Sequence, residues 1–338
     1  IYNIGDDGAQ LDPPIKTLFV YNSDIANCTP NSGNVRKGMM RDDLFITVHE
    51  TFWTDSCMYA DIILPADTAL ERTDCHWAYG SWFLGINKPV IEPLGESINN
   101  TELFRMLADK MGYVDSTDNA FTQTDEEIIK DILLEAENED GERFNCLTEG
   151  IDYDDVVKNG WARASTGSKR RDFLKNGWPT PSGKIEIKCE AITAEYPDVS
   201  PFPEYVPEIN GQYDPNKEKF PIQVLSSASH YFIGDSFQSV PRLQAMQSRP
   251  TVEISLGDAK ARGIEDGDLV RLYNDNGETY CYAVLIEGLL DGVCATQKQF
   301  KGSNTPGGLN VNNLNSEMLT DFGKSPTFYS VLVEIEKA

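Results

Sequence analysis

The sequence lacks closely spaced cysteines. Its seven cysteines are scattered, and no two lie within four residues of each other. Zinc ribbons and iron–sulfur loops place two ligands on one tight turn, so we expect no metal cluster within this segment. The odd number and the wide scatter also argue against a disulfide framework. We interpret the cysteines mostly as small buried hydrophobic residues in a reducing compartment, and we expect a cytoplasmic protein.

Long apolar runs and positive charge are also scarce. The longest apolar run, 283–290, is broken by Glu287 and Gly288. It is far shorter than the roughly 18–20 residues of a membrane-spanning helix, so we expect no membrane span in this segment. Only 29 Lys and Arg stand against 54 Asp and Glu, which gives a net charge of −25. This acidity argues against nucleic acid or an anionic membrane as partner, although adaptation to the cellular milieu explains it better than any function does.

Several sequence signatures of enzymes are missing. There is no G-x-G-x-x-G or G-x-x-x-x-G-K-[ST] phosphate loop and no G-x-S-x-G nucleophile elbow. The chain has only three His, so a histidine-rich metal site is not expected. It opens at Ile1 on polar, glycine-containing sequence, which is typical of a segment cut from a longer protein at a loop.

The first part of the chain alternates strand and helix signals. Short apolar runs followed by turn or helical segments predict strands over 15–21, 44–49 and 60–65. Apolar residues at helical spacing predict a helix over 99–111, which Asn100 or Thr101 can cap. A second helix is expected over 125–136. Short strands separated by such segments favour a parallel, Rossmann-like α/β sheet with right-handed crossovers.

The last part has a different character. β-branched and aromatic runs predict six short strands, over 220–225, 251–254, 269–274, 280–286, 292–297 and 329–335. The turn at 275–277 is a hairpin signal because Asn and Gly tolerate positive φ. A short helix is expected over 255–262, started or capped by Asp258 and ended by Gly263. Six strands with few helices in this length favour a closed β-barrel.

These patterns divide the chain into three parts. We expect an α/β domain over 1–150, a connecting segment over 151–218 and a barrel over 219–338. Within the connecting segment, five prolines between 197 and 218 indicate an interdomain linker.

Polar loops follow the first two predicted strands. In an open α/β sheet, ligands bind beyond the carboxyl ends of the strands. Asn22 and Ser23 follow the first strand, and a loop with Glu50, Thr54 and Asp55 follows the second. Such hydroxyls, amides and backbone N–H groups can hold a nucleotide, and a carboxylate can accept from ribose hydroxyls or guanine N–H groups. Ordinary turn capping explains each loop about as well.

Two further polar clusters lie in the barrel part. A serine-rich loop contains Ser227 and ends at His230, with Ser236 shortly after it. The second cluster, 310–315, contains Asn312 and Asn313, whose planar amides match the edge of a pterin or a guanine. A lone His is more often structural than catalytic, and Asn also favours turns.

In order, these segments resemble a known family. The runs LFVYNSD (18–24), RDDLF (41–45), VHETFWTD (48–55) and YADIILP (59–65) closely resemble consecutive segments of molybdopterin oxidoreductases of the dimethyl sulfoxide reductase superfamily. Glu71 and Thr73 follow at the matching places. The resemblance covers nearly the whole chain and is weakest over 116–180.

The barrel part carries the family's signatures as well. The run DAKARGIEDGDLV (258–270) is similar to the signature of its dinucleotide-binding barrel, and PSGKIE (181–186) resembles the segment before that domain. VHETFWTDS (48–56) and TDFGKSPTFY (320–329) are most similar to the biotin sulfoxide reductase-like group.

This resemblance implies a fold, a cofactor and a set of site residues. The fold would be a parallel Rossmann-like α/β domain followed by a six-stranded double-psi β-barrel that covers the pterins. The cofactor would be molybdenum or tungsten, held by the dithiolenes of two molybdopterin guanine dinucleotides. The matching positions are Asn22 and Glu50 for a guanosine, in loops that also contain Ser23, Thr54 and Asp55, with Ser227, His230, Ser236, Asn312 and Asn313 nearer the pterins.

The resemblance implies a two-electron or oxygen-atom transfer, of the anaerobic dehydrogenase or S/N-oxide reductase type, on a small-molecule substrate. The metal's protein ligand and the family's [4Fe–4S] cysteines would lie upstream, so we assign no catalytic residue here, and an iron–sulfur subunit is the expected electron-transfer partner. Asp24 departs from the family, which commonly has Pro there. A non-redox hydratase or transhydroxylase, or a metal-free binding module, are the alternatives.

Overall fold

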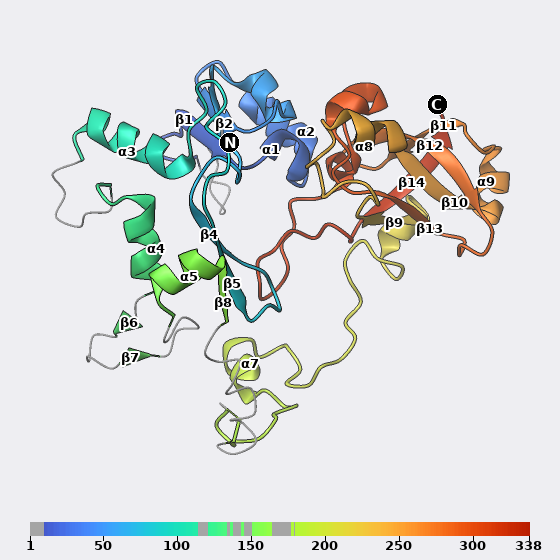
Figure 1. The fold of residues 1–338 in the computed structure, drawn as a ribbon. Helices are drawn as coiled ribbons and strands as arrows, with labels where there is room; N and C mark the ends of the chain where they lie inside the picture. Colours follow the sequence, from blue (N-terminus) through green and yellow to red (C-terminus); the bar gives the residue numbers. More distant parts are fainter. Residues whose placement is uncertain are drawn as a thin grey trace. The chain divides into compact units, whose positions relative to one another are not determined.

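The computed structural model describes residues 10–113, 121–133, 136–137, 143–144, 151–163, 177–178 and 180–338. They form two compact units (Figure 1). The barrel unit joins Ile1–Leu64 to Val206–Ala338, and the middle unit is Pro65–Tyr205. Within the described residues, no helix combines the length and the apolar character needed to cross a membrane.

The barrel unit contains a three-stranded sheet in the order β1-β2-β3. Its strands are β1 (Thr17–Tyr21), β2 (Phe45–Glu50) and β3 (Ile62–Pro65), close to the three predicted runs. β1 and β2 are parallel, with Val20 opposite Val48. The chain between them forms α1 (Ile25–Cys28) and α2 (Ser32–Met39), and the 3₁₀ helix η1 (Asp55–Tyr59) follows β2. The core beneath these helices contains Ile46 and Val48, both fully buried.

The second part of the barrel unit is a closed barrel of six strands in the order β10-β12-β11-β14-β9-β13. The strands are β9 (Ile222–Ser227), β10 (Thr251–Ser255), β11 (Leu269–Tyr273), β12 (Glu278–Ile286), β13 (Val293–Gln297) and β14 (Leu332–Lys337). Alternate residues such as Val270 and Leu272 point inward and are fully buried. The six predicted strands and the predicted fold class are therefore confirmed.

Short helices precede the first barrel strand or connect the barrel strands. They are η3 (Pro215–Glu218), α8 (Pro241–Met246), α9 (Leu256–Arg262), η4 (Gly302–Asn304), η5 (Pro306–Gly308) and η6 (Val311–Leu314). α9 begins after Ser255, whose Oγ accepts from the Asp258 N–H at 3.0 Å, so the serine and not Asp258 is the cap. Gly263 ends the helix at φ +66°, as predicted.

The hairpin between β11 and β12 forms where it was predicted, but for a different reason. Neither Asn276 nor Gly277 has a positive φ. Instead, the side-chain oxygen of Asn274 accepts from the N–H groups of Asn276 at 2.9 Å and Gly277 at 3.3 Å. The turn is therefore an Asx turn, in which a side chain replaces a backbone acceptor.

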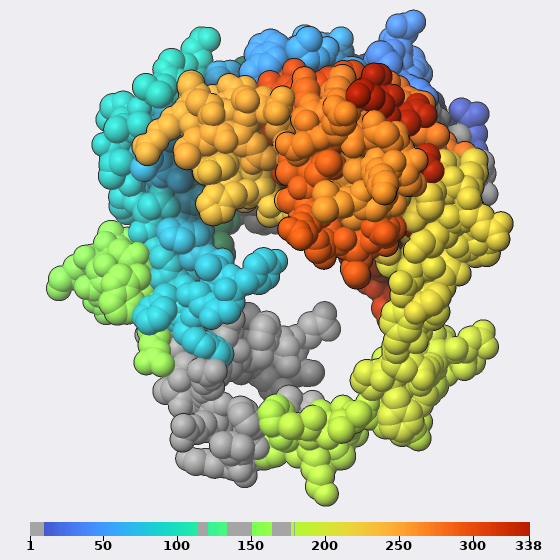
Figure 2. All heavy atoms as spheres, turned by 90° about the vertical axis from the view of Figure 1, so that its right-hand side faces the viewer, coloured from blue at the N-terminus to red at the C-terminus, as the bar shows by residue number. Residues whose placement is uncertain are grey.

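The N-terminal sheet region and the barrel belong to the same compact unit because hydrogen bonds join them directly. Asn310 Nδ2 in the barrel part, for example, donates to Asn27 Oδ1 in α1 at 2.6 Å. Figure 2 shows the blue N-terminal segment against the orange to red barrel. This grouping differs from a division of the chain into consecutive domains over 1–150 and 219–338.

The middle unit has its own small core. Its elements are β4 (Asp74–Trp77), β5 (Phe83–Asn87), α3 (Asn100–Met111), α4 (Asp125–Leu133), β6 (Ala136–Glu137), β7 (Arg143–Phe144), α5 (Tyr153–Asn159), β8 (Trp161–Arg163) and α7 (Glu190–Glu195). α4 and α5 pack on the antiparallel sheet β4-β5-β8 through Leu84, Ile129 and Val156. The predicted helix over 99–111 is present, and its cap is Asn99. Residues 197–214 contain no helix or strand, in line with the predicted linker.

Candidate functional site

The loops that follow β1 and β2 are tied together by one buried carboxylate. Asp24 is 3% exposed. Its Oδ1 accepts from the N–H of Ser56 at 2.9 Å and from the Ser56 hydroxyl at 2.6 Å, and its Oδ2 accepts from the Asp55 N–H at 3.2 Å. The Ser56 hydroxyl oxygen in turn accepts from the Ala26 N–H at 3.1 Å. Asp24 therefore fixes the two strand-end loops against each other.

The residues predicted to hold a nucleotide line these loops. Asn22 and Ser23 are exposed, and Glu50 and Thr54 are half-buried. The Glu50 carboxylate accepts from the Thr51 N–H at 2.8 Å and also from the Ser23 backbone. Burial raises the pKa of Glu50 above its ordinary value, while these hydrogen bonds lower it. A ligand that donates hydrogen bonds to this carboxylate would stabilise its charged form.

A loop of the barrel part faces the same strand ends. Asp235 lies close enough to Asp24, Glu50 and Asp55 to raise the pKa of the first two, and it accepts a hydrogen bond from the Cys28 thiol. Burial is the main cause of the raised pKa of Asp235, and Lys301 partly offsets it. We call Asn22, Ser23, Glu50, Asp235 and Ser236 the strand-end site. Its residues come from the loop after β1, the end of β2 and the loop after β9, all within the barrel unit.

Among the described residues, three of the six non-glycine residues with a positive φ lie in or beside this site. Asn22, Phe237 and Gln299 have φ values of +50°, +69° and +54°. A left-handed conformation costs energy for residues other than glycine, and such strain gathers at ligand sites. Asn tolerates it, but Phe and Gln do so less readily. The surrounding hydrogen bonds must therefore hold Phe237 and Gln299 in place.

The predicted pterin-facing residues fall into two groups. Ser227, His230 and Ser236 are exposed and can reach a ligand. His230 stacks edge to face on Tyr231, with ring centroids 4.9 Å apart. Ser227 ends β9, where the N–H of Lys298 donates to its carbonyl at 2.8 Å. These three side chains offer neutral donors at the surface of the barrel.

Asn312 and Asn313 form the second group and are buried, as is Asp55 of the loop predicted to face the guanosine. Asn312 Nδ2 donates to the Asn27 carbonyl at 2.9 Å, and Asn313 Nδ2 donates to the Glu278 carbonyl at 2.7 Å. Asp55 accepts from the Ser303 N–H and forms an ion pair with Arg36, both at 3.2 Å. Asn312 and Asp55 thus hold the α/β part to the barrel part, whereas Asn313 holds its own loop to β12.

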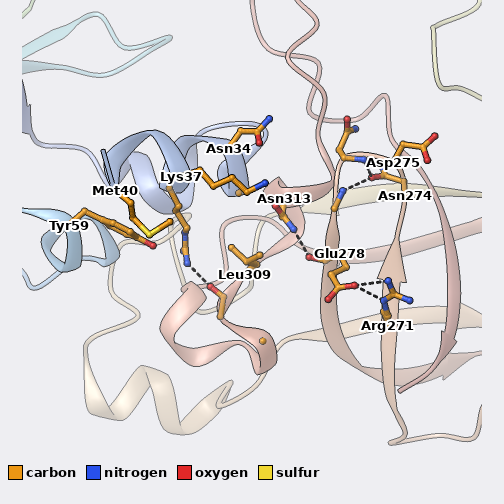
Figure 3. A pocket seen from close by; sticks show the side chains of 16 residues that line it. Asn34, Lys37, Met40, Tyr59, Arg271, Asn274, Asp275, Glu278, Leu309 and Asn313 are labelled. Atoms are coloured by element: carbon orange, nitrogen blue, oxygen red, sulfur yellow. Dashed lines mark hydrogen bonds and ion pairs between the residues drawn. The ribbon is translucent and has the colours of Figure 1, made fainter. Parts of the chain in front are cut away.

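A separate pocket of about 550 Å³ lies where α2 meets the β11–β12 hairpin (Figure 3). Asn34, Lys37 and Met40 of α2 line one side, and Arg271 and Glu278 lie across from them. The charged pair on the hairpin side is already satisfied, because Arg271 bonds to Glu278 at 2.6 Å and to Glu336 at 2.9 Å. We therefore place the ligand chemistry at the strand-end site.

The residues that support this site carry no local sequence signal. Asp24 departs from the family pattern, and no motif marks Ser56, Asn27, Arg36 or Gln238. Their side chains act across loops that are far apart in the sequence, such as Asn27 with Asn310. No local spacing signals such a partnership.

Two family models match the chain. The molybdopterin oxidoreductase family matches residues 8–110, and the molydopterin dinucleotide binding domain matches residues 222–332. The two matches include the strand ends and most of the barrel, respectively. Both therefore contribute residues to the strand-end site.

Curated relatives extend over nearly the whole chain. "Probable oxidoreductase YoaE" of Bacillus subtilis is 34% identical over 97% of this chain and 45% of its own length. Dimethyl sulfoxide reductase DmsA of Escherichia coli is 27% identical over 97% of this chain and 42% of its own length. The chain thus spans less than half the length of these relatives.

A solved structure shares the fold. Acetylene hydratase from Pelobacter acetylenicus superposes with a TM-score of 0.74 and covers 96% of this chain and 44% of its own chain. Sequence identity is 19%, so this likeness concerns the fold alone.

Proposed function

Since the chain belongs to the molybdopterin oxidoreductases of the dimethyl sulfoxide reductase superfamily, we propose that it is the cofactor-binding part of an enzyme that uses molybdopterin guanine dinucleotide with molybdenum or tungsten. The reaction proposed for the whole enzyme is a two-electron or oxygen-atom transfer on a small molecule. Electrons would pass through an upstream [4Fe–4S] centre and an iron–sulfur partner subunit.

One observation carries this proposal. The surface at the strand ends combines exposed neutral side chains, Asn22, Ser23 and Ser236, with half-buried carboxylates at Glu50 and Asp235. The pKa of each carboxylate is raised chiefly by burial. Hydrogen bonds from the N–H groups of a guanine or the hydroxyls of a ribose would stabilise the charged form of these carboxylates, which burial disfavours. The residues present therefore fit a guanosine.

We assign different roles to the two sides of the site. Asn22, Ser23 and Glu50 would hold a guanosine, and Ser227, His230 and Ser236 would donate toward a pterin. In a chain of net charge −25, neutral donors must carry the binding of an anionic cofactor. When bound, the metal supplies the redox chemistry, while these residues position the cofactor. Asn312, Asn313 and Asp55 would act on the cofactor through the loops they hold.

Analysis of the intact enzyme tests the proposal. We expect purified protein to contain molybdenum or tungsten together with pterin that fluoresces after oxidation. Glu50→Gln should lower pterin content because an amide presents a donor where the carboxylate accepts. Glu253→Gln changes an exposed side chain on β10 and serves as the matched control. Wild-type enzyme without pterin or metal would overturn the proposal.

The reaction type needs a separate assay. We expect the loaded enzyme to oxidise a reduced dye in the presence of an S-oxide or N-oxide. Hydration of an unsaturated substrate without any dye oxidation would instead favour the non-redox alternative.

A further inference from the structure

Two buried amide side chains connect the halves of the strand-end site. The first is Asn27 in α1, which is fully buried. Its Oδ1 accepts from Asn310 Nδ2 at 2.6 Å and from the Gly302 N–H at 3.1 Å. Its backbone carbonyl accepts from Asn310 Nδ2 at 3.1 Å and from Asn312 Nδ2 at 2.9 Å. One residue thus holds three residues of the barrel part.

The second amide is Gln238, which is 2% exposed. Its Nε2 donates to the carbonyls of Gly234 and Gln299, both at 2.8 Å, and its Oε1 accepts from the Lys301 N–H at 2.7 Å. A side chain at Gly234 would lie 2.4 Å from Gln299 Oε1, so the two segments are in close contact. Gln238 therefore fixes the 234–236 loop to the segment 299–301.

These contacts form one continuous path. The turn with Asn22 and Ser23 leads directly into α1, which contains Asn27. Asn27 holds Gly302, the neighbouring Lys301 is held by Gln238, and Gln238 holds the loop that contains Ser236. The strained φ of Gln299 lies within this path. Loss of one buried amide would leave donors in the interior without acceptors, which the protein relieves by moving the segment.

We propose that Asn27 is a positioning residue that sets the spacing between the guanosine-facing turn and the pterin-facing loop. This inference rests on the proposed function, because the spacing matters only if one cofactor contacts both sides. Asn27 does not touch the cofactor in this account. It acts by keeping Gly302, Asn310 and Asn312 against α1.

The test uses the intact holoenzyme and three variants. Asn27→Leu keeps a similar volume but removes the Oδ1 acceptor from Gly302 and Asn310. Asn27→Asp keeps that acceptor, but it replaces the donor to Gln299, a contact at 3.4 Å, by an oxygen and brings a carboxyl group into the interior. Val252→Ala, in the fully buried barrel core, is the control for a general loss of stability. Each protein is assayed at the same interval below its own Tm.

Two readouts separate positioning from general destabilisation. We expect Asn27→Leu to release pterin and metal roughly tenfold faster than Val252→Ala, with Asn27→Asp between Asn27→Leu and wild type. Hydrogen exchange in peptides that cover 299–313 should rise in Asn27→Leu and not in the control. Equal release and equal exchange in Asn27→Leu and Val252→Ala would overturn the inference. Wild-type enzyme without pterin would instead overturn the proposed function itself.

Discussion

The carboxylate of Asp24 and the hydroxyl of Ser56 are 2.6 Å apart, and this contact ties the loop after β1 to the loop after β2. Burial raises the pKa of Asp24, although hydrogen bonds from Ser56 oppose the rise. Burial of the Asp24 carboxylate is unfavourable by itself. The carboxylate nevertheless holds three donors at the strand ends, which are two backbone N–H groups and one hydroxyl.

Removal of this carboxylate should destabilise the barrel unit. Asp24→Ala leaves the N–H groups of Asp55 and Ser56 without their acceptor in the interior. We expect the free energy of unfolding to fall by about 2 kcal/mol in urea titrations. Asp42→Ala changes an exposed carboxylate in the same unit and should have little effect. Equal losses in both variants would contradict the role given to Asp24.

The ion pair between Arg36 and Asp55 is buried, with side-chain exposures of 13% and 6%. Arg36 also donates to the carbonyls of Ala26 at 2.7 Å and Gly308 at 2.6 Å. Arg36→Met leaves Asp55 buried beside Asp24 and Asp235, so we expect a loss of about 3 kcal/mol in the free energy of unfolding.

Arg41→Met provides the control for that variant. The Arg41 side chain is 17% exposed, much like Arg36, but its partner Asp43 at 2.8 Å is 48% exposed, so water can solvate that carboxylate when the arginine is lost. We expect urea titrations to show a near-normal free energy of unfolding. A loss in Arg41→Met as large as in Arg36→Met would count against a special role for the buried pair.

Two glycines leave room for the amide of Asn313. A Cβ at Gly33 would lie 2.2 Å from Asn313 Oδ1, and one at Gly277 would lie 2.4 Å from Asn313 Nδ2. Replacing Gly by Ala inside a helix such as α2 normally stabilises the helix by about 1 kcal/mol. The clash between the new Cβ and Asn313 should outweigh this gain. We expect Gly33→Ala to lower the free energy of unfolding by about 1–3 kcal/mol.

A double mutant identifies the cause of that loss. Asn313→Ala removes the clashing atoms, so the effects of Gly33→Ala and Asn313→Ala should be non-additive. Gly323→Ala is the control, because its Cβ would come no closer than 3.6 Å to another atom. Additive effects of Gly33→Ala and Asn313→Ala in thermal unfolding would show that the clash is not responsible.

The stability of the unit should depend on pH through Asp235. Burial raises the pKa of this carboxyl above its ordinary value of 3.8, so the folded state keeps a proton that the unfolded chain has released. The free energy of unfolding therefore falls as pH rises from that value through the raised pKa of the folded state. Asp235→Asn should reduce this fall in the pH range that begins near the ordinary pKa of the carboxyl group.

Part of the decline should remain in Asp235→Asn, because the pKa values of Asp24 and Glu50 are also raised by burial. Asp321→Asn, at an exposed position in the same unit, should leave the pH profile of wild type unchanged. The free energy of unfolding is measured by urea titration at each pH. The same pH dependence in Asp235→Asn and in wild type would show that Asp235 does not cause the decline.

Much of the fold follows from local patterns. Apolar runs located β1, β2 and the six barrel strands, and Gly263 correctly marked the end of α9. The helix caps were placed less well, because Asn99, Asn100 and Thr101 are all good caps and only the start of the helix decides among them. The hairpin at 275–277 was found for the wrong reason, because the Asx turn of Asn274 leaves the φ of Gly277 negative or extended.

The candidate site could be predicted only in part. The position of Asn22, Ser23 and Glu50 at the ends of predicted strands indicates a ligand site, because ligands bind at the carboxyl ends of parallel strands. The planar amides of Asn312 and Asn313 indicate a match to a pterin edge, but their burial and their internal bonds follow from contacts with α1 and β12. Long-range partners of this kind leave no periodic signal in a sequence.

The structure of the holoenzyme with its cofactor bound tests the central claim most directly. The account predicts a guanosine whose donors lie within about 3.2 Å of the Glu50 carboxylate, beside Asn22 and Ser23, and a pterin on the side of Ser236 and His230. A cofactor that contacts none of these residues would contradict it.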